Sequence, residues 1–224
     1  FTKADSLSGI SNFLLAWGRR MGFTGPAEVI PNGVDIGHFS HEYEREEIQM
    51  VREKLAKKPD DIFLVTTSRL VHKNAFDDVI RALACLPDHL HFWLYGIGTD
   101  ERALKELSKK LNLTSRVHFM GHIHHDEMPL VLKACDIFIR PSRSEGMGNS
   151  FIEAMAAGLP VIATQEGGIA DFLFDATRNP DKPTTGWAVD KDSPEQIVEA
   201  VKDILAHPEQ VARVRETAKR MVVE

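Results

Sequence analysis

Short apolar runs alternate with amphipathic segments along most of this 224-residue chain. Mostly apolar runs of strand length lie at residues 62–67, 90–95, 117–120, 137–139, 161–163 and 186–189. Segments with helical periodicity lie between or after them, at residues 74–86, 101–111, 126–134, 151–157, 193–205 and 208–221. Continuous apolar runs predict buried strands, and their alternation with helices predicts βαβ units with right-handed crossovers. We therefore predict an α/β fold, a Rossmann-like doubly wound parallel sheet with helices on both faces.

The segments outside this regular alternation are shorter or more polar. A strand, a helix and a second strand are predicted near the start of the chain, at residues 5–10, 11–21 and 28–30. Residues 41–58 are rich in charge and place Ile48, Val51 and Leu55 on one helical face, which is typical of a surface helix. Residues 167–174 predict one further short helix.

The stretch from Arg140 to Ala163, R-P-S-R-S-E-G-M-G-N-S-F-I-E-A-M-A-A-G-L-P-V-I-A, carries the most chemistry. An apolar run ends, Glu145 follows in a glycine-containing loop, and Asn149 and Ser150 precede a helix as preferred N-cap residues. Main-chain N–H groups at a helix start favour an anion, and here Glu145 and Glu153 flank them. Anion-binding groups between two carboxylates suit a ligand with phosphate in the middle and hydroxyl groups on either side, as in a nucleotide sugar.

Polar residues or glycines directly follow five of the predicted strands. They are Arg69, Gly96, Gly121, Ser142 and Gly167. Because the carboxyl ends of parallel strands meet at one edge of a sheet, and ligands of such sheets bind there, we expect these positions to surround one site.

Composition excludes several other classes of protein. The net charge of −6 offers no basic surface for nucleic acid. No apolar run approaches the ~20 residues that span a bilayer. Cys85 and Cys135 lie in apolar segments, so we expect buried free thiols in a reducing compartment and a cytoplasmic protein. Because the chain begins with Phe1, we expect it to be a piece of a longer protein.

Several motifs, in order, resemble those of retaining glycosyltransferases of the family-4 type, which have the GT-B architecture of two Rossmann-like domains. E-G-M-G-N-S-F-I-E at residues 145–153 is similar to their E-x7-E signature. The other matches are P-N-G-V-D at 31–35, S-R-L-V-H-K at 68–73, G-H-I at 121–123, A-C-D-I-F-I-R-P-S at 134–142 and G-G at 167–168. The resemblance implies that residues 32–224 form the C-terminal, donor-binding domain. Residues 1–31 would be a remnant of the N-terminal acceptor domain or a linker.

The resemblance also implies roles for individual residues. Arg69 and Lys73 would hold the donor diphosphate and neutralise the leaving group, and Glu145 would contact the transferred sugar; these three are the candidate catalytic residues. Glu153 would bind ribose hydroxyls. Sugar and phosphate oxygens would meet the backbone of Gly146, Met147, Gly148, Asn149 and Ser150. The nucleobase would lie against His122 and Ile123.

One departure from the family pattern affects Lys73, which stands one residue closer to Arg69 than usual and precedes Asn74–Ala75 instead of a glycine. Gly167 and Gly168 either add N–H groups to the site or form a plain turn.

Two polar motifs elsewhere invite other interpretations. The H-I-H-H run at 122–125 invites a metal site, which we disfavour because neither a cysteine nor a well-spaced carboxylate completes it. D-K-D at 190–192 resembles the D-x-D motif of metal-dependent transferases, which have a different fold. We interpret it as a helix start, because S-P-E-Q at 193–196 predicts a capping box with Pro194 first in the helix.

The favoured function is binding of a UDP- or GDP-linked sugar for transfer of a hexosyl group to an acceptor glycan or lipid-linked glycan. The acceptor would be held by the missing N-terminal domain, so the fragment alone would be inactive. The nucleotide sugar is a substrate, and we expect neither a cofactor nor a metal. Peripheral association of the intact enzyme with a membrane stays open. Alternatives are a non-catalytic nucleotide-binding domain of the same fold and a nucleotide-sugar epimerase.

Overall fold

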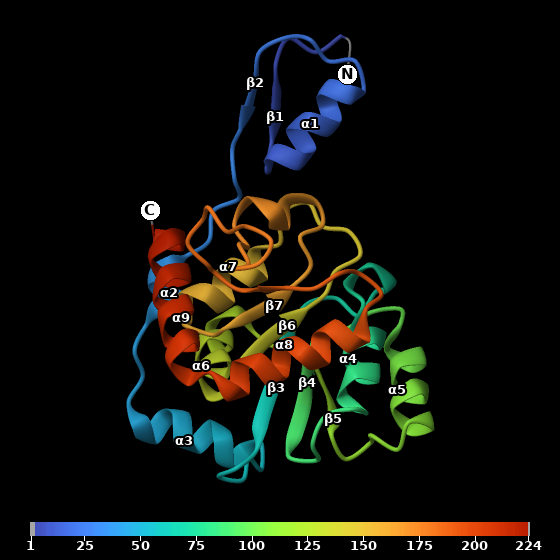
Figure 1. The fold of residues 1–224 in the computed structure, drawn as a ribbon, viewed down its shortest axis with the longest axis vertical. Coiled ribbons are helices and arrows are strands. Elements are labelled where there is room, and N and C mark those ends of the chain that lie inside the picture. The colour runs from blue at the N-terminus through green and yellow to red at the C-terminus, as the bar shows by residue number, and fades with distance from the viewer. Residues whose placement is uncertain (1–2, 224) are drawn as a thin grey trace.

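The computed structural model describes residues 3–223. Its main body is a parallel sheet of six strands in the order β5-β4-β3-β6-β7-β8 (Figure 1). The strands are β3 (Ile62–Thr67), β4 (Leu90–Tyr95), β5 (Val117–Gly121), β6 (Ile137–Arg140), β7 (Val161–Ala163) and β8 (Trp187–Ala188). The chain proceeds outward from β3 to β5 and then crosses back to place β6 on the other side of β3. The strand order therefore reverses between β3 and β6.

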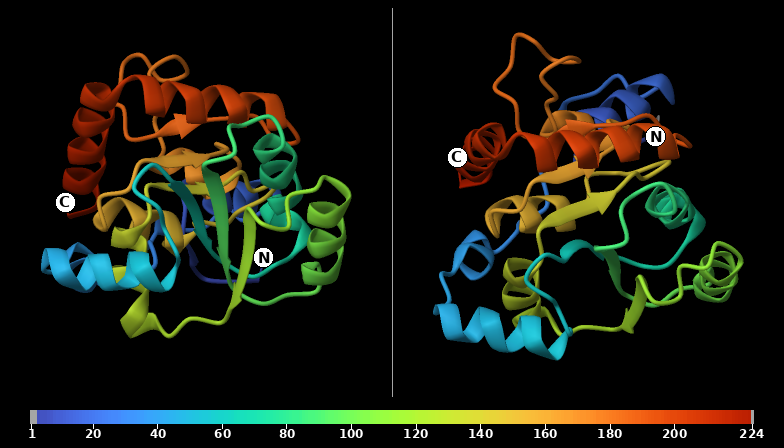
Figure 2. Two further views of the ribbon diagram at one scale, coloured as in Figure 1. Left: turned by 90° about the horizontal axis from the view of Figure 1, so that it is seen from below. Right: turned by 60° about the horizontal axis from the view of Figure 1, so that its bottom comes forward.

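Helices cover both faces of this sheet (Figure 2). One apolar cluster joins the sheet to α4 (Phe76–Leu83), α5 (Glu101–Lys110) and α8 (Pro194–Ala206). A second joins it to α2 (Ile36–Ser40), the region of α3 (Arg45–Lys54), α6 (Met128–Ala134), α7 (Asn149–Ala156) and α9 (Pro208–Val223). Successive strand residues alternate between the two: Leu64 belongs to the first cluster, and Phe63 and Val65 to the second. The predicted doubly wound α/β fold is confirmed.

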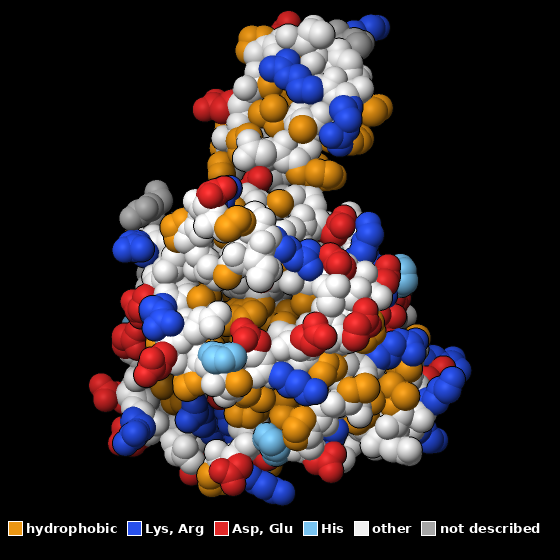
Figure 3. Space-filling model, in the orientation of Figure 1, with side chains coloured by type: hydrophobic (Ala, Val, Ile, Leu, Met, Phe, Trp, Pro, Cys, Tyr) orange, Lys and Arg blue, Asp and Glu red, His pale blue; other side chains and the backbone are white. Residues whose placement is uncertain are grey.

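A small separate unit precedes this body. Strands β1 (Leu7–Gly9) and β2 (Ala27–Val29) pair in parallel, with α1 (Asn12–Arg20) between them. The unit projects from the main body (Figure 3) and meets it at the 3₁₀ helix η3 (Gly167–Asp171), where the Asn12 N–H donates to the Asp171 carboxylate at 2.8 Å. The two predicted strands and the helix of this segment are present; the first strand and the helix are shorter than predicted, and the second strand begins one residue earlier. Its origin in an acceptor domain stays a prediction.

Three predicted helices are interrupted or shortened. The helix expected at 41–58 is reduced to α3, and α2 precedes it without having been predicted. The helix expected at 74–86 is broken by Ala75, whose φ of +57° separates the 3₁₀ helix η1 (His72–Asn74) from α4. The helix expected at 126–134 begins as the 3₁₀ helix η2 (His125–Glu127) and continues as α6.

The predicted capping box at the start of α8 is wrong. Pro194 does occupy the first turn, but the Ser193 side chain makes no cap and donates instead to the Lys191 carbonyl. Gln196 turns to Asp190, accepting from its main-chain N–H at 2.8 Å and donating to its carboxylate at 2.9 Å. Gln196 therefore pairs with Asp190, ahead of the helix, and not with Ser193 as a capping box requires.

The two cysteines, both predicted to be buried free thiols, differ in exposure. Cys135 is a buried free thiol as expected, whereas Cys85 is a free but exposed thiol in the turn that follows α4. Among residues 3–223, no helix has both the length and the apolar character needed to cross a lipid bilayer.

Candidate functional site

A cavity of about 250 Å³ opens at the carboxyl edge of the sheet, between the loops that follow β3 and β6. This is the point where the strand order reverses, which is where doubly wound sheets bind their ligands. Its walls are Ile10, Asn32, Ser68, Arg69, Lys73, Asn74, Arg140, Glu145, Met147, Gly148, Asn149 and Ser150. The structure therefore brings all three candidate catalytic residues to one cavity, although Arg69 and Glu145 are far apart in the sequence.

The loop after β3 presents Arg69 and Lys73. The Asn74 amide fixes this loop by donating to the Ser68 hydroxyl at 2.9 Å and to the Arg69 carbonyl at 2.7 Å. The Lys73 carbonyl accepts from the Arg143 N–H at 2.7 Å, which ties the loop to the one after β6. The Arg69 side chain is exposed, and Lys73 is half-exposed. The shorter spacing between Arg69 and Lys73 still places both cations at the cavity.

Glu145 is held rigidly on the opposite wall. One carboxylate oxygen, Oε1, accepts from the Gly146 N–H at 2.9 Å. The other, Oε2, accepts from Arg140 Nη2 at 3.0 Å and lies 3.5 Å from Lys73 Nζ. A carboxylate with fixed neighbours can accept a hydroxyl group in a defined direction.

Arg140, at the end of β6, is a site residue that sequence reasoning missed. It is only 4% exposed and lies over the Phe151 ring at 4.1 Å. Its Nη1 donates to Ser68 Oγ at 3.0 Å and to Ser150 Oγ at 2.8 Å. Burial lowers the pKa of Arg140 to about 10, against the opposing effect of Glu145, so the group is still charged at neutral pH. The signal in the sequence was an arginine ending an otherwise apolar strand, I-F-I-R.

Helix α7 begins at the cavity, but its start differs from the prediction. Neither Asn149 nor Ser150 is the N-cap; that position belongs to Gly148, at φ +85°. A Cβ on Gly148 would lie 2.6 Å from the Phe151 ring and 2.7 Å from Arg140 Nη2, so only glycine fits there. The first N–H groups of α7 have no partner within the helix and lie at the wall of the cavity, where they favour an anion.

The two side chains expected to cap α7 have other partners. Ser150 accepts from Arg140, as described above. The Asn149 side chain instead faces the segment that leads into the main body. Its Oδ1 accepts from Asn32 Nδ2 at 3.3 Å and its Nδ2 donates to the Gly33 carbonyl at 3.5 Å.

The pair Gly167–Gly168 packs against the backbone of the glycine loop at Glu145 and Gly146. The Gly168 N–H donates to the Glu145 carbonyl at 3.1 Å. A Cβ on Gly168 would lie 2.8 Å from the Gly146 carbonyl carbon and 2.7 Å from Ser11 Cβ. The Gly168 N–H is therefore used to hold the loop, and the pair is present because the loop packs directly against it.

Glu153, His122 and Ile123 do not line this cavity. Glu153 lies in the second turn of α7, near His125, Arg140 and His38. Burial raises the pKa of the Glu153 carboxyl, and those three neighbours oppose the shift. His122 is exposed, and Ile123 packs against the second apolar cluster.

A histidine pair beside Glu153 could hold a metal ion. The rings of His38 and His125 stack at 5.0 Å, and His38 Nε2 lies 3.1 Å from the His125 carbonyl oxygen. Together with Asp126 they offer ligand atoms within 4.8 Å of one another. The H-I-H-H run therefore contributes one histidine to this group, and a partner distant in sequence, His38, supplies another.

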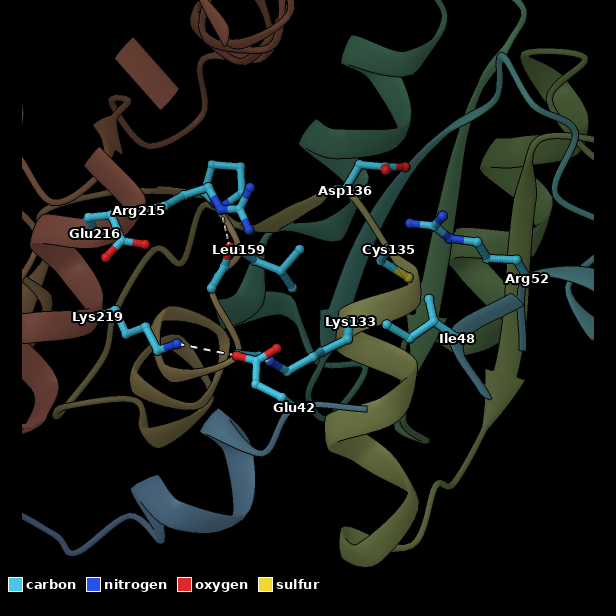
Figure 4. Close-up of a pocket in the computed structure, with 13 residues that line it drawn as sticks. Glu42, Ile48, Arg52, Lys133, Cys135, Asp136, Leu159, Arg215, Glu216 and Lys219 are labelled. Atoms are coloured by element: carbon cyan, nitrogen blue, oxygen red, sulfur yellow. Dashed lines mark hydrogen bonds and ion pairs between the residues drawn. The ribbon is translucent and has the colours of Figure 1, made fainter. Parts of the chain in front are cut away.

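A cavity of about 420 Å³ lies at the opposite edge of the sheet, at the amino ends of β6 and β7 (Figure 4). Three of its charged side chains pair with one another: Glu42 lies 3.2 Å from Lys133 and 3.4 Å from Lys219. Parallel sheets do not bind ligands at this edge, so we assign the cavity no function.

The chain matches the family described as glycosyl transferases group 1 over residues 47–221. It is 29% identical over 223 residues to a GDP-mannose-dependent monoacylated alpha-(1-6)-phosphatidylinositol monomannoside mannosyltransferase of Corynebacterium glutamicum, covering 92% of this chain and 54% of that protein. It is 30% identical over 194 residues to a GDP-mannose-dependent alpha-(1-6)-phosphatidylinositol monomannoside mannosyltransferase of Mycobacterium tuberculosis, covering 81% and 48%.

The fold is shared with solved structures. The crystal structure of Anabaena HepE in complex with UDP and glucose has a TM-score of 0.88 at 21% identity, covering 98% of this chain and 58% of that one. The chain spans about half the length of the curated relatives it matches. The predicted resemblance is confirmed, and the chain belongs to the glycosyl transferases group 1 family.

Proposed function

We propose that residues 32–224 bind the nucleotide-sugar donor of a retaining hexosyltransferase. One observation carries this proposal: two cations, a fixed carboxylate and the start of α7 converge on a single cavity at the strand-order reversal. A nucleoside diphosphate sugar needs cations for its phosphates and a hydroxyl acceptor for its sugar. The cavity offers both within the reach of one ligand.

The proposed chemistry follows the charge that develops when the nucleoside diphosphate leaves. Arg69, Lys73 and the first N–H groups of α7 stabilise the negative charge on the phosphates, and the N–H groups, which the helix holds in place, need little reorganisation. Glu145 accepts a hydroxyl of the transferred sugar. These groups can bind the phosphates and stabilise their negative charge without a metal ion. Retention of configuration rests on the family resemblance.

The names of the relatives guide the choice of donor and acceptor. Two relatives are named GDP-mannose-dependent, and Anabaena HepE was crystallised with UDP and glucose, so both UDP and GDP sugars belong in the test. For the acceptor we propose a glycan or lipid-linked glycan at the cytoplasmic side of a membrane. We place the acceptor-binding groups ahead of residue 32, because Ile10 already reaches the cavity wall.

A non-catalytic nucleotide-binding domain was supported only by the shortened spacing before Lys73. Because Lys73 still lines the cavity, that support is weakened. The two functions are separated by measuring sugar transfer with a chain that includes the acceptor-binding part.

The test is thermal melting and calorimetry of this chain with UDP, GDP and a panel of their sugars, in the presence of EDTA and then of Mg²⁺. We expect one nucleoside diphosphate to raise the melting temperature in EDTA. At ~100 times its Kd, linkage adds about 2.7 kcal/mol of stability. Stabilisation by no nucleotide would refute the proposed function, and stabilisation only with Mg²⁺ would refute its metal independence.

A further inference from the structure

Arg140 joins three segments that border the proposed donor cavity. Its guanidinium reaches Ser68 after β3, Glu145 in the glycine loop and Ser150 in α7, at 3.0, 3.0 and 2.8 Å. A guanidinium is planar and directs its N–H groups along fixed directions. Because one rigid side chain serves all three segments, it fixes their positions relative to one another.

This placement is unfavourable for the fold itself. The Nε atom of Arg140 is buried and has no hydrogen-bond partner among the described residues. An unpaired buried polar group costs about 1–3 kcal/mol. An apolar side chain of similar volume could fill the space, and buried ion pairs replaced in this way often leave a protein as stable as before. The arrangement therefore suggests a purpose beyond stability.

Glu145 has a second cationic neighbour, and the two differ in mobility. Lys73 Nζ lies 3.5 Å from the same oxygen that Arg140 contacts, and the Lys73 side chain is 42% exposed whereas that of Arg140 is 5% exposed. Lys73 has a flexible stem and can turn to another anion. Arg140 is enclosed by Phe151, the glycine loop and its hydrogen-bond partners.

We propose that Arg140 is a positioning residue. It keeps Glu145 directed at the sugar while Lys73 leaves its ion pair with Glu145 and pairs with the donor diphosphate. The inference rests on the proposed donor site. Without a donor, Lys73 pairs with Glu145. When the donor binds, Lys73 pairs with its phosphates instead. Glu145 then keeps its geometry only because Arg140 still holds Oε2 and the Gly146 N–H still holds Oε1.

The test compares Arg140→Lys with Arg116→Lys in this chain. Arg116 is a matched control, since it is 7% exposed, binds the Leu86 and Leu90 carbonyls and lies at the amino end of β5, away from the cavity. A lysine at 140 keeps the charge but cannot reach three partners at once. We expect Arg140→Lys to reduce the affinity ratio of nucleotide sugar to nucleoside diphosphate at least 10-fold, with diphosphate affinity within 3-fold of wild type. Arg116→Lys should lower the melting temperature and leave the ratio unchanged.

A third variant assigns the two cations separate roles. Lys73→Met should weaken the diphosphate and preserve the affinity ratio. If Lys73→Met removes the ratio and Arg140→Lys does not, Lys73 positions Glu145 and the inference is overturned. In a Glu145→Gln background, Arg140→Lys should change the ratio no further; an additional loss would also overturn it.

Amide hydrogen exchange of the chain without a donor also tests whether Arg140 positions Glu145. Because the Gly146 N–H donates to Glu145, we expect its exchange to become at least 10-fold faster in Arg140→Lys and to be unchanged in Arg116→Lys. Unchanged exchange at Gly146 in Arg140→Lys would overturn the inference, even if the wild type bound no nucleotide. Absence of nucleotide binding by the wild type would refute the proposed function alone.

Discussion

Replacing Gly168 with alanine tests whether η3 sets the position of the glycine loop. The backbone of Gly168 is not in the left-handed region, so alanine is compatible with its conformation. The new Cβ would lie 2.8 Å from the Gly146 carbonyl carbon and 2.7 Å from Ser11 Cβ. Carbon atoms in contact are about 3.5–4.0 Å apart, and the Gly146 carbonyl oxygen would lie nearer still, so the neighbours must recede by at least about 1 Å. Both are backbone or short side-chain atoms, which cannot swing aside.

The displacement acts directly on the proposed donor site. It stretches the bond from the Gly168 N–H to the Glu145 carbonyl, which is 3.1 Å in the wild type. A misplacement of ~1 Å can reduce the rate or affinity at a preorganised site by on the order of 10²-fold. We therefore expect Gly168→Ala to weaken nucleotide-sugar binding by about 10- to 100-fold.

The assay is calorimetric titration with the best nucleotide sugar, with thermal melting of each variant alongside. The matched control is Gly33→Ala, because a Cβ on Gly33 would meet no atom within 4 Å. We expect this control to bind as the wild type does and to be stabilised by about 0.4–1 kcal/mol through the unfolded chain. Wild-type affinity in Gly168→Ala would show that the loop is placed independently of η3 and would refute the reasoning.

Three further predictions concern binding, stability and pH. Calorimetry should show that Glu153→Gln weakens UDP or GDP itself, whereas Glu145→Gln removes only the additional affinity of the sugar, each by about 1–3 kcal/mol; identical profiles would contradict the division. Urea unfolding should show Ala56→Gly to be more stable by about 1 kcal/mol, because Ala56 is exposed at φ +52° after α3. Burial, followed by the charge of His91, lowers the pKa of His118 to about 4, so His118 stays neutral when folded but is protonated in the unfolded chain below its ordinary pKa of 6.5. Stability should be complete above that pH and fall as pH drops toward 4, by on the order of 1–2 kcal/mol after allowance for partial solvent exposure; a His118→Gln variant with the same pH dependence would contradict this.

The fold could be predicted because its signals are local. The strands at 62–67 and 90–95 match in both bounds, since an apolar run buried on both faces needs no distant partner to be recognised. Strand order alone predicted that Arg69 lies at this edge of the sheet, and the family resemblance implied that Lys73 and Glu145 join it.

The remaining details depended on distant partners. Ser150 does not cap α7 because Arg140 recruits its hydroxyl, and Gln196 does not complete a capping box because Asp190 engages it. Arg140 itself was missed because its three acceptors, separated in the sequence, converge only in the folded chain. The break in the helix at Ala75 could not be predicted either, because nothing in the local sequence indicates a left-handed backbone at this alanine.

The contact between the N-terminal unit and η3 has a mechanical consequence. Asn12 is bonded to Asp171, and Ser11 packs against Gly168, which in turn abuts Gly146. A rotation of the unit about the connection at residues 30–35 would therefore push on the glycine loop, which we propose binds the sugar. By reciprocity, a ligand that orders this loop must also restrict the unit's orientation. Spin labels at Arg20 and Lys202 should show a narrower distance distribution with donor bound; an unchanged distribution would refute the coupling. Occupancy of the proposed donor cavity would then be transmitted to the N-terminal unit.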